Sequence, residues 1–220
     1  WPSLDQDIEF IKQHRHQVLV FSCGSAMHPL YKAGITPDIH FEIERTDYIA
    51  QWISLIDDEA YFQDVPLVAT HNVAPIVFSK FKNTFAFLKP NDPGTDLILQ
   101  IANGQGGKLL QAYGSNPQVG NGVLAFALYM GFKNIHLFGI DVGYKDKNYH
   151  HSKDSEYYGS FADKFGVARQ GNKEVKGNFG GTVYTEMVYD HSRHVLEWIL
   201  QRPEFSDVSC INCSDGAFIH

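Results

Sequence analysis

Polar residues that could bind or transform a small ligand recur at the ends of short apolar segments in this 220-residue sequence. Each segment has the length and β-branched content of a buried parallel strand. In an open parallel sheet, ligands bind beyond the carboxyl ends of the strands, where loops and helix N-termini converge. The candidates for a ligand site are therefore Ser22, Gly24 and Ser25; Glu42 and Glu44; Thr70, His71 and Asn72; Asp141, Gly143 and Tyr144; and Asn212, Ser214 and Asp215.

A second candidate is the loop of small residues at 114–122, which leads into an apolar helical pattern. Free backbone N–H groups at a helix N-terminus favour a bound anion. The loop has neither the G-x-G-x-x-G pattern after a strand nor the Lys-Ser/Thr of a Walker A loop. It is compatible with a phosphate site and equally with a plain glycine-rich helix cap.

The polar stretch around His150 and His151 offers acid–base chemistry. Adjacent residues of a regular strand point to opposite faces, so a metal site that uses both histidines is disfavoured. One histidine could act as a general base or acid, while Lys153 and Tyr157 neutralise a departing phosphate. The alternative is a surface loop with an accidental histidine pair. Six other histidines are expected to be structural or solvated: His14, His16, His28, His136, His191 and His194.

Charge and cysteine content exclude several classes of protein. The net charge is -7 with both signs mixed along the chain, which argues against nucleic-acid binding. The three cysteines are too few for a disulfide framework, and the single C-x-x-C at Cys210 and Cys213 has no second pair to complete a zinc site. No metal ligand set is predicted. The absence of a signal peptide or membrane segment, together with the cysteine content, predicts a cytoplasmic protein.

Helical and strand patterns alternate along the chain, which predicts βαβ crossovers and a mostly parallel sheet. Residues 75–113 give a weak pattern that includes one strand, a turn at 91–94 and a glycine-rich loop at 104–107. The polar, glycine-rich segment 143–181 is expected to be an inserted lid or binding loop. The predicted helices are 4–11, 26–33, 48–56, 123–130 and 185–200, and the predicted strands are 17–22, 38–43, 66–70, 85–88, 134–140 and 208–213.

The fold class expected from these patterns is α/β. Hydrophobic residues make up 44% of the chain, which is enough for a full core and excludes a disordered chain. We expect one Rossmann-like domain over residues 1–220, with helices on both faces of the sheet. Both ends stop without a capping element, so we also expect the domain to be excised from a longer protein.

Motifs spread over essentially the whole chain occur together in one family of proteins. The first motif is Cys23-Gly24-Ser25-Ala26, followed by residues 30–38 and 42–44. The second is 119–121, which precedes a helix that ends at 128–133. The others are 138–144 together with 150–153, and residues 212–217 near the end of the chain. In these motifs the chain resembles the motility accessory factor (Maf) proteins. The opening 1–4 is similar to the tail of the family's Gly-x-Gly-Pro-Ser-Leu, with Trp1 where a glycine is usual.

This resemblance implies a flagellin glycosyltransferase whose central domain is similar to bacterial sialyltransferases. The donor would be a CMP-linked nonulosonic acid (pseudaminic, legionaminic or sialic-type), and the acceptor a Ser or Thr hydroxyl of flagellin. Glu42 or Glu44 would bind ribose or sugar hydroxyls. The base would be His150 or His151, with Asp141 or Glu44 as alternatives. Tyr144, Tyr157 or Lys153 would stabilise the leaving phosphate. The cytidine and phosphate would be held by Ser3, Gly24, Ser25, Asn72, Asn116, Gly120 and Asn121.

Two other functions remain open at this point. The wider superfamily contains the MptE-like 6-hydroxymethylpterin diphosphokinases, so the chain could be a pterin pyrophosphokinase that uses ATP and Mg²⁺. Asp141 with Glu42 or Glu44 could then hold the metal ion. Alternatively, the domain only binds flagellin or a nucleotide and has no activity of its own.

Overall fold

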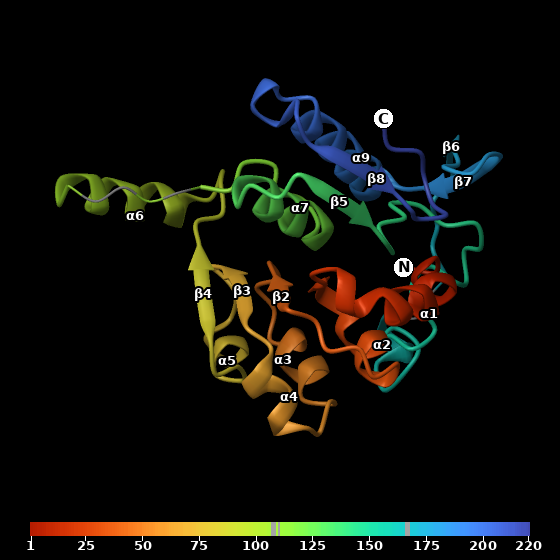
Figure 1. Cartoon of the computed structure of the whole chain (residues 1–220), viewed down its shortest axis with the longest axis horizontal. Helices are drawn as coiled ribbons and strands as arrows, with labels where there is room; N and C mark the ends of the chain where they lie inside the picture. The colour runs from red at the N-terminus through yellow and green to blue at the C-terminus, as the bar shows by residue number, and fades with distance from the viewer. Residues whose placement is uncertain (107–108, 110, 166–167) are drawn as a thin grey trace.

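The computed structural model of the chain describes residues 1–106, 109, 111–165 and 168–220. Its centre is a four-stranded parallel sheet in the order β1–β2–β3–β4, with helices interleaved between the strands (Figure 1). The α/β fold class predicted from the sequence is confirmed. The strands are β1 (Phe21–Cys23), β2 (Ile39–Glu42), β3 (Leu67–Thr70) and β4 (Thr84–Phe87).

One face of the sheet is covered by four short helices that follow the strands. They pack on Leu67 and Ala69 of β3, and Val65 and Val77 of the same apolar cluster are fully buried. Burial of apolar area of this kind is the main stabilising contribution to the layer. The helices are α2 (Met27–Lys32), α3 (Tyr48–Ile53), α4 (Glu59–Asp64) and α5 (Pro75–Phe78).

The other face is covered by α7 (Val119–Tyr129), whose Val123 joins a cluster with Phe41 and Val68. A Cβ atom at Gly122 would lie 2.6 Å from Cε1 of Phe41, so only glycine lets this helix approach β2 so closely. The helix is apolar on nearly all sides because α9 (Met187–Leu200) packs on it as well.

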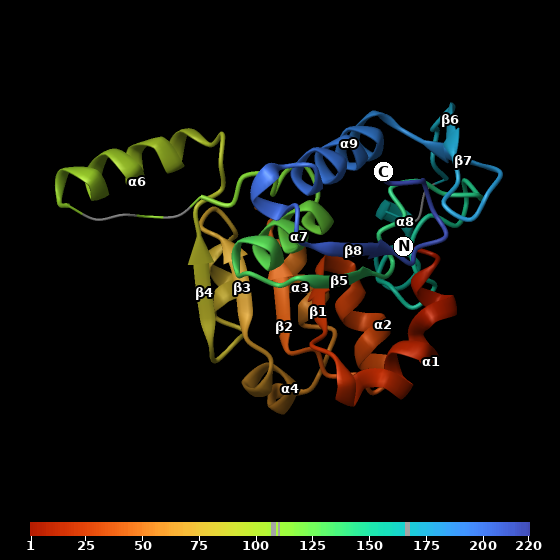
Figure 2. The ribbon, with the colours of Figure 1, turned by 45° about the horizontal axis from the view of Figure 1, so that its top comes forward.

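A second group of strands lies beyond α7. Strand β5 (Asn134–Leu137) pairs in parallel with β8 (Ser209–Asn212), and both cross the direction of β1–β4 in the two views (Figures 1 and 2). Strand β6 (Lys173–Lys176) pairs antiparallel with β7 (Thr182–Thr185). The remaining elements are α1 (Leu4–His14), α8 (Ala162–Phe165) and 3₁₀ turns at Arg15–Gln17, Gly24–Ala26 and Pro203–Phe205.

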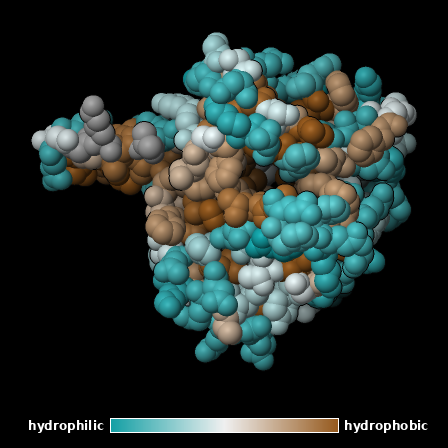
Figure 3. Space-filling model, viewed as in Figure 1, coloured by the Kyte–Doolittle hydropathy of each residue, from teal (hydrophilic) through white to brown (hydrophobic). Residues whose placement is uncertain are grey.

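Helix α6 (Pro93–Gly104) projects from the body as an arm (Figures 1 and 2). Its Leu97 and Ile101 side chains are 58% and 55% exposed, and apolar surface is visible on the arm in Figure 3. The sequence predicted a turn at 91–94 and no helix after it. That turn is the start of α6, because the Asp92 carboxylate accepts hydrogen bonds from the backbone N–H groups of Gly94 and Thr95.

Several boundaries differ from the sequence-based prediction, and two of these differences concern candidate site segments. Helix α7 begins at Val119, so Gly120 and Asn121 belong to its first turn rather than to a preceding loop, and Asn121 Oδ1 accepts a hydrogen bond from the N–H of Gln118. The segment predicted as an inserted lid or binding loop, 143–181, contains α8 and also β6, which pairs along its length with β7. Among the described residues, no helix is long and apolar enough to cross a membrane.

Candidate functional site

The loop after β1 meets the N-terminus of α7 at the carboxyl edge of the sheet. Gly24 has a φ of 50°, a left-handed conformation that favours glycine. A Cβ atom at Gly24 would lie 3.0 Å from Cγ1 of Val119, the first residue of α7. The two glycine-containing segments that the family resemblance expects to hold the cytidine and phosphate are therefore adjacent in space.

A row of three buried polar side chains runs along the sheet to the end of β2. Ser22 and His40 are directly opposite each other on β1 and β2, and Ser22 Oγ lies 2.8 Å from Nδ1 of His40. His40 Nε2 lies 3.1 Å from Oε1 of Glu42. The other carboxylate oxygen of Glu42, Oε2, is buried without a hydrogen-bond partner. Since Glu42 is only 1% exposed, its carboxylate is held rigidly at this edge.

A small cavity of about 10 Å³ adjoins Glu42. It is polar on one side, where His28 Nε2 lies 3.5 Å from Oε1 of Glu156, and apolar on the other. Burial lowers the pKa of His28, with the Glu156 charge acting in the opposite direction. The residues around the cavity are Gly24, Ser25, Met27, His28, Glu42, Ile49, Trp52, Ile53 and Glu156.

Glu44 follows Glu42 on the same edge, but its side chain is exposed. Partial desolvation, followed by the Glu42 charge, raises the pKa of Glu44, and the charges of Lys89 and Arg45 oppose this shift. Partial burial lowers the pKa of Lys89, which follows β4. The edge thus carries one buried and one exposed carboxylate within electrostatic reach of a lysine.

The segment 149–158 is attached to the start of α1 by one carboxylate. Asp5 accepts hydrogen bonds from the hydroxyl of Tyr149, from Ser152 Oγ at 2.5 Å and from the N–H of Lys153 at 3.0 Å. The hydroxyl of Tyr158 accepts the backbone N–H groups of both residues 150 and 151. These bonds fix the backbone that carries the two histidines.

His151 is buried in a stack of aromatic rings. The ring of Tyr157 lies parallel to it with a centroid distance of 3.5 Å, and Trp1 stacks at 5.2 Å. Burial lowers the pKa of His151 well below its ordinary value, and the charge of Arg169 adds to the shift. His151 is therefore neutral near pH 7, as a general base must be.

The tautomer of His151 follows from its neighbours. Nδ1 of His150 lies 2.7 Å from Nδ1 of His151 and 3.5 Å from Nε of Arg169. A guanidinium has no acceptor, so Arg169 donates and Nδ1 of His150 accepts. Nδ1 of His151 must then carry the hydrogen of its bond to His150, which leaves the lone pair of a neutral His151 on Nε2.

Asp141 and Tyr144 occupy buried positions after β5. Asp141 accepts hydrogen bonds from the N–H and the hydroxyl of Ser3. Burial raises the pKa of Asp141, although the two Ser3 bonds act against this shift. The hydroxyl of Tyr144 accepts the N–H of Gly171 at 3.0 Å. Ser3 and Asp141 are thus brought together, and Tyr144 lies next to His150 with ring centroids 6.4 Å apart.

Three other predicted site residues, Asn72, Asn116 and Asn121, lie apart from the histidine pair. Asn72 accepts from Thr70 Oγ1 and donates to Asp92 at the ends of β3 and β4. Asn116 donates to the carbonyl of Pro90, close to Asp92 in the chain. The side chain of Lys153, two residues after His151, is exposed. Asn121 is fully buried between α7 and α9, where it donates to the Ser192 carbonyl and accepts from the Ser192 hydroxyl.

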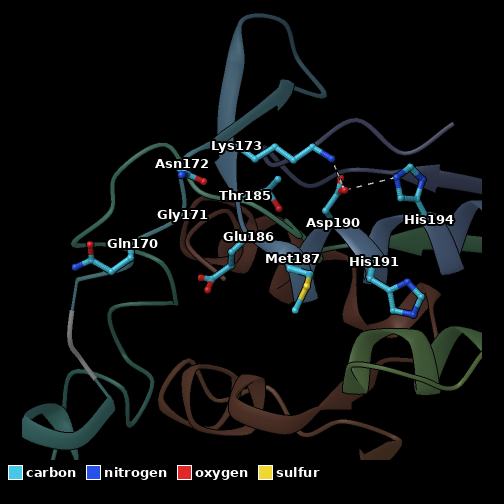
Figure 4. A pocket seen from close by; sticks show the side chains of 10 residues that line it. All are labelled: Gln170, Gly171, Asn172, Lys173, Thr185, Glu186, Met187, Asp190, His191 and His194. Atoms are coloured by element: carbon cyan, nitrogen blue, oxygen red, sulfur yellow. Dashed lines mark hydrogen bonds and ion pairs between the residues drawn. The ribbon is translucent and has the colours of Figure 1, made fainter.

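A larger cavity of about 570 Å³ lies between the β6–β7 hairpin and the first half of α9 (Figure 4). Asp190 points toward Lys173 and His194 there, and its Oδ2 accepts from Lys173 Nζ at 2.5 Å. Burial would raise the pKa of Asp190, but hydrogen bonds from Lys173 and Arg193 outweigh it and lower the pKa. The lining residues are Gln170, Gly171, Asn172, Lys173, Thr185, Glu186, Met187, Asp190, His191 and His194.

Sequence reasoning did not single out His40, Glu156, Arg169 or Asp5, and it expected His28 to be structural or solvated. One signal was available, because His40 and Glu42 are two residues apart on a strand and so share a face. The other residues reach the site only through tertiary contacts. Among the described residues, no cluster of three or more His, Cys, Asp or Glu side chains could hold a metal ion.

The fold and this edge define an α/β domain with its candidate site at the carboxyl ends of parallel strands. The chain belongs to the MptE-like family, since the model described as 6-hydroxymethylpterin diphosphokinase MptE-like matches residues 2–147. A comparison with curated proteins finds no match.

Among solved structures, the chain is similar to the MAf glycosyltransferase from Magnetospirillum magneticum AMB-1, with a TM-score of 0.77 and 27% sequence identity. The match covers 99% of this chain and 31% of that protein, so the chain spans about a third of its length. The resemblance to Maf proteins predicted from the sequence is confirmed.

Proposed function

We propose that this domain is a glycosyltransferase that moves a nonulosonic acid from its CMP-sugar to a Ser or Thr hydroxyl of flagellin. The observation that carries the proposal is the match to a Maf glycosyltransferase over nearly the whole chain. The buried, neutral His151 beside the carboxyl edge supports it, because transfer to a hydroxyl needs a base.

In the proposed reaction, the acceptor oxygen forms a bond to the anomeric carbon while the bond from that carbon to the CMP phosphate breaks, with inversion. The acceptor proton passes to Nε2 of His151, and CMP leaves with the bonding electrons. Arg169 has two roles in this scheme. It fixes the tautomer through His150, and its positive charge, near the rings of His151 and Tyr157, favours the departing phosphate.

The acceptor polypeptide would approach through the larger cavity beside α9. Glu186 lines that cavity and lies 3.8 Å from Arg169, which donates to His150. Gly171, also in the lining, donates to Tyr144. The acceptor hydroxyl would reach Nε2 of His151 from this cavity only after the layer of side chains that includes Glu186 moves aside when the acceptor binds.

A thermal-shift titration with CMP, CDP and ATP, each with and without Mg²⁺, tests the donor class. A ligand that binds only the folded state stabilises it by about 2.7 kcal/mol at a hundredfold excess over its Kd. We expect stabilisation by CMP without metal. Stabilisation by ATP only in the presence of Mg²⁺ would contradict the proposal and favour the pyrophosphokinase. The match of residues 2–147 to the MptE-like model supports that second candidate.

The base is tested by mass spectrometry of the modified acceptor. His151→Gln should lower the transfer rate by about 10²- to 10⁴-fold with CMP binding retained, because a general base contributes a factor of this size. His16→Gln, in the exposed 3₁₀ turn that follows α1, is the matched control for a lost imidazole. If His150→Ala and His151→Ala both leave transfer intact, the histidine base is wrong.

A further inference from the structure

The outer edge of β6, on the side away from β7, is paired over only part of its length. Residues 216–218 run antiparallel along one end of it, where the N–H of Phe218 donates to the carbonyl of Lys176 at 2.9 Å. The chain then leaves the edge, because the N–H of His220 bonds to a side chain of α9. The other end of the edge, residues 172–174, is exposed.

The hydrogen-bond pattern of the hairpin shows which backbone groups face this free edge. Backbone groups of successive residues in an antiparallel strand point to opposite sides. The N–H of Gly177 bonds across the hairpin, so the backbone groups of Val175 and Lys173 also face β7. Those of Glu174 and Asn172 therefore face outward, and within the described part of the chain nothing bonds to them. Two N–H and two C=O groups are thus open to another strand.

The free part of the edge borders the cavity of about 570 Å³, which both Asn172 and Lys173 line. The side chain of Lys173 points toward Asp190 of α9 (Figure 4). Val175, two residues further along β6, packs on the same side against the core cluster that contains Tyr189. Side chains of directly opposite residues lie on the same face of a sheet. A residue paired opposite Lys173 would therefore direct its side chain into the cavity.

We propose that the free edge of β6 binds the acceptor polypeptide as an added antiparallel strand, with the Ser or Thr to be modified opposite Lys173. This docking mode rests on the proposed transferase function. Open backbone groups at strand spacing pair with another extended backbone, so the partner is a polypeptide segment. The antiparallel direction follows from residues 216–218, which already run that way along the same edge.

Backbone methylation of an acceptor peptide tests the register. The probe is a nine-residue synthetic peptide with one central threonine, valines on both sides and a lysine at each end. In the proposed pairing the two neighbours of the threonine bond to Asn172 and Glu174, whereas the N–H of the threonine points away from β6. N-methylation of either neighbour should weaken binding to the whole chain about 10-fold in an NMR titration. N-methylation of the threonine should leave the Kd within about twofold.

The protein side of the pairing is read from single amides. The unmethylated peptide should slow hydrogen exchange at the N–H groups of Asn172 and Glu174, measured by NMR. The N–H of Lys173 should change little, because it already faces β7. Glu174→Pro removes one outward N–H at a position where an edge strand tolerates proline. Its KM for the peptide should be about 10-fold above that of Glu174→Ala, which keeps the N–H, with kcat and CMP affinity similar in the two variants.

The outcomes separate the docking mode from the proposed function. Sugar transfer to the peptide without protection of the two amides would overturn the docking mode and leave the transferase standing. Protection of both amides without transfer would support the docking edge and count against the transferase. Equal effects of methylation at all three positions, or no binding of the unmethylated peptide at millimolar concentration, would overturn the docking mode. Weaker binding only on methylation of the threonine would overturn the antiparallel register.

Discussion

His151 illustrates how single residues in this protein take their properties from their neighbours. A histidine in water is half protonated near pH 6.5, but the rings of Trp1 and Tyr157 exclude water from this one. Its hydrogen is placed on Nδ1 by the bond to His150, which in turn accepts from Arg169. Sequence alone identified the histidine pair, but neither its charge state nor its tautomer.

A pH-dependent stability follows for His151. Its pKa in the folded state lies below the unfolded value of 6.5, so the unfolded chain binds more protons in that window. Stability is therefore complete above about pH 6.5 and falls as the pH drops, by at most about 1.4 kcal/mol per pH unit for one group. Urea unfolding at pH 5.5 and 7.5 should show a smaller difference for His151→Gln than for the wild type.

His28 contributes in the same direction, because its pKa is also lowered, so part of the pH dependence should remain in His151→Gln. The buried Asp141, whose pKa is raised, acts with the opposite sign at lower pH. The comparison between variant and wild type removes both contributions. Equal pH dependence of the two proteins would show that His151 is not buried in the neutral form.

Asn121 gives a second prediction at this scale. Its amide joins α7 to α9 through Ser192 and also caps α7 at Gln118. Asn121→Ala should lower the free energy of unfolding by about 1–3 kcal/mol for each buried group left without a partner. Ser192→Ala, which removes one of these bonds, should cost less in the same chemical denaturation experiment. A neutral Asn121→Ala would mean that water replaces the amide.

At the scale of elements, loops are held in place by carboxylates at helix starts. Asp58 accepts from the N–H of Tyr61 and begins α4, and Asp92 begins α6 in the same way. The carboxylate of Asp5, in the first turn of α1, instead accepts hydrogen bonds from Ser152 and Lys153, which are far away in the sequence. The order of the segment 149–158 thus depends on α1.

Asp5→Ala should therefore release residues 149–158. We expect faster hydrogen exchange at the backbone amides of this segment, measured by mass spectrometry, and reduced transfer because the histidines lose their fixed position. Asp7→Ala is the matched control, since it removes an acidic residue from the same helix turn without a bond to the segment. Similar exchange in both variants would contradict the role given to Asp5.

Helix α6 is predicted to contribute little to the stability of the body. Leu97 and Ile101 are exposed one helical turn apart, so the double change to lysine should alter the free energy of unfolding by no more than about 0.5 kcal/mol. Leu124→Lys, in the buried helix α7, is expected to prevent folding. A large loss of stability in the α6 variant would show that the arm packs against something in solution.

The sequence predicted the elements that have a simple pattern. β3 was found because a fully buried strand is continuously apolar, and the shared carboxyl edge placed Gly24 and Glu42 together. Helices α4 and α6 were missed because each begins at a capping aspartate, and aspartate is equally typical of turns. Arg169 could not be found, since its contact with His150 exists only after the chain has folded back over the edge.

At the scale of the whole molecule, the two similarities to known proteins cover different parts of the fold. The MptE-like family covers residues 2–147, which include the four-stranded sheet, α7 and β5. The similarity to the Maf glycosyltransferase extends over the rest, including Arg169 and the cavity beside α9. The part of the chain after residue 147 thus lies outside the MptE-like match but within the similarity to the Maf glycosyltransferase.

The two faces of the sheet are completed at different times during synthesis. Residues 21–87 supply the four strands and the helices of one face, whereas α7, which covers the other face, begins only at Val119. A nascent chain that has not reached α7 therefore exposes Phe41, Ile43 and Val68 to water. Such surfaces make incomplete chains prone to aggregate, so slow translation between residues 87 and 129 would favour insoluble product over folded protein.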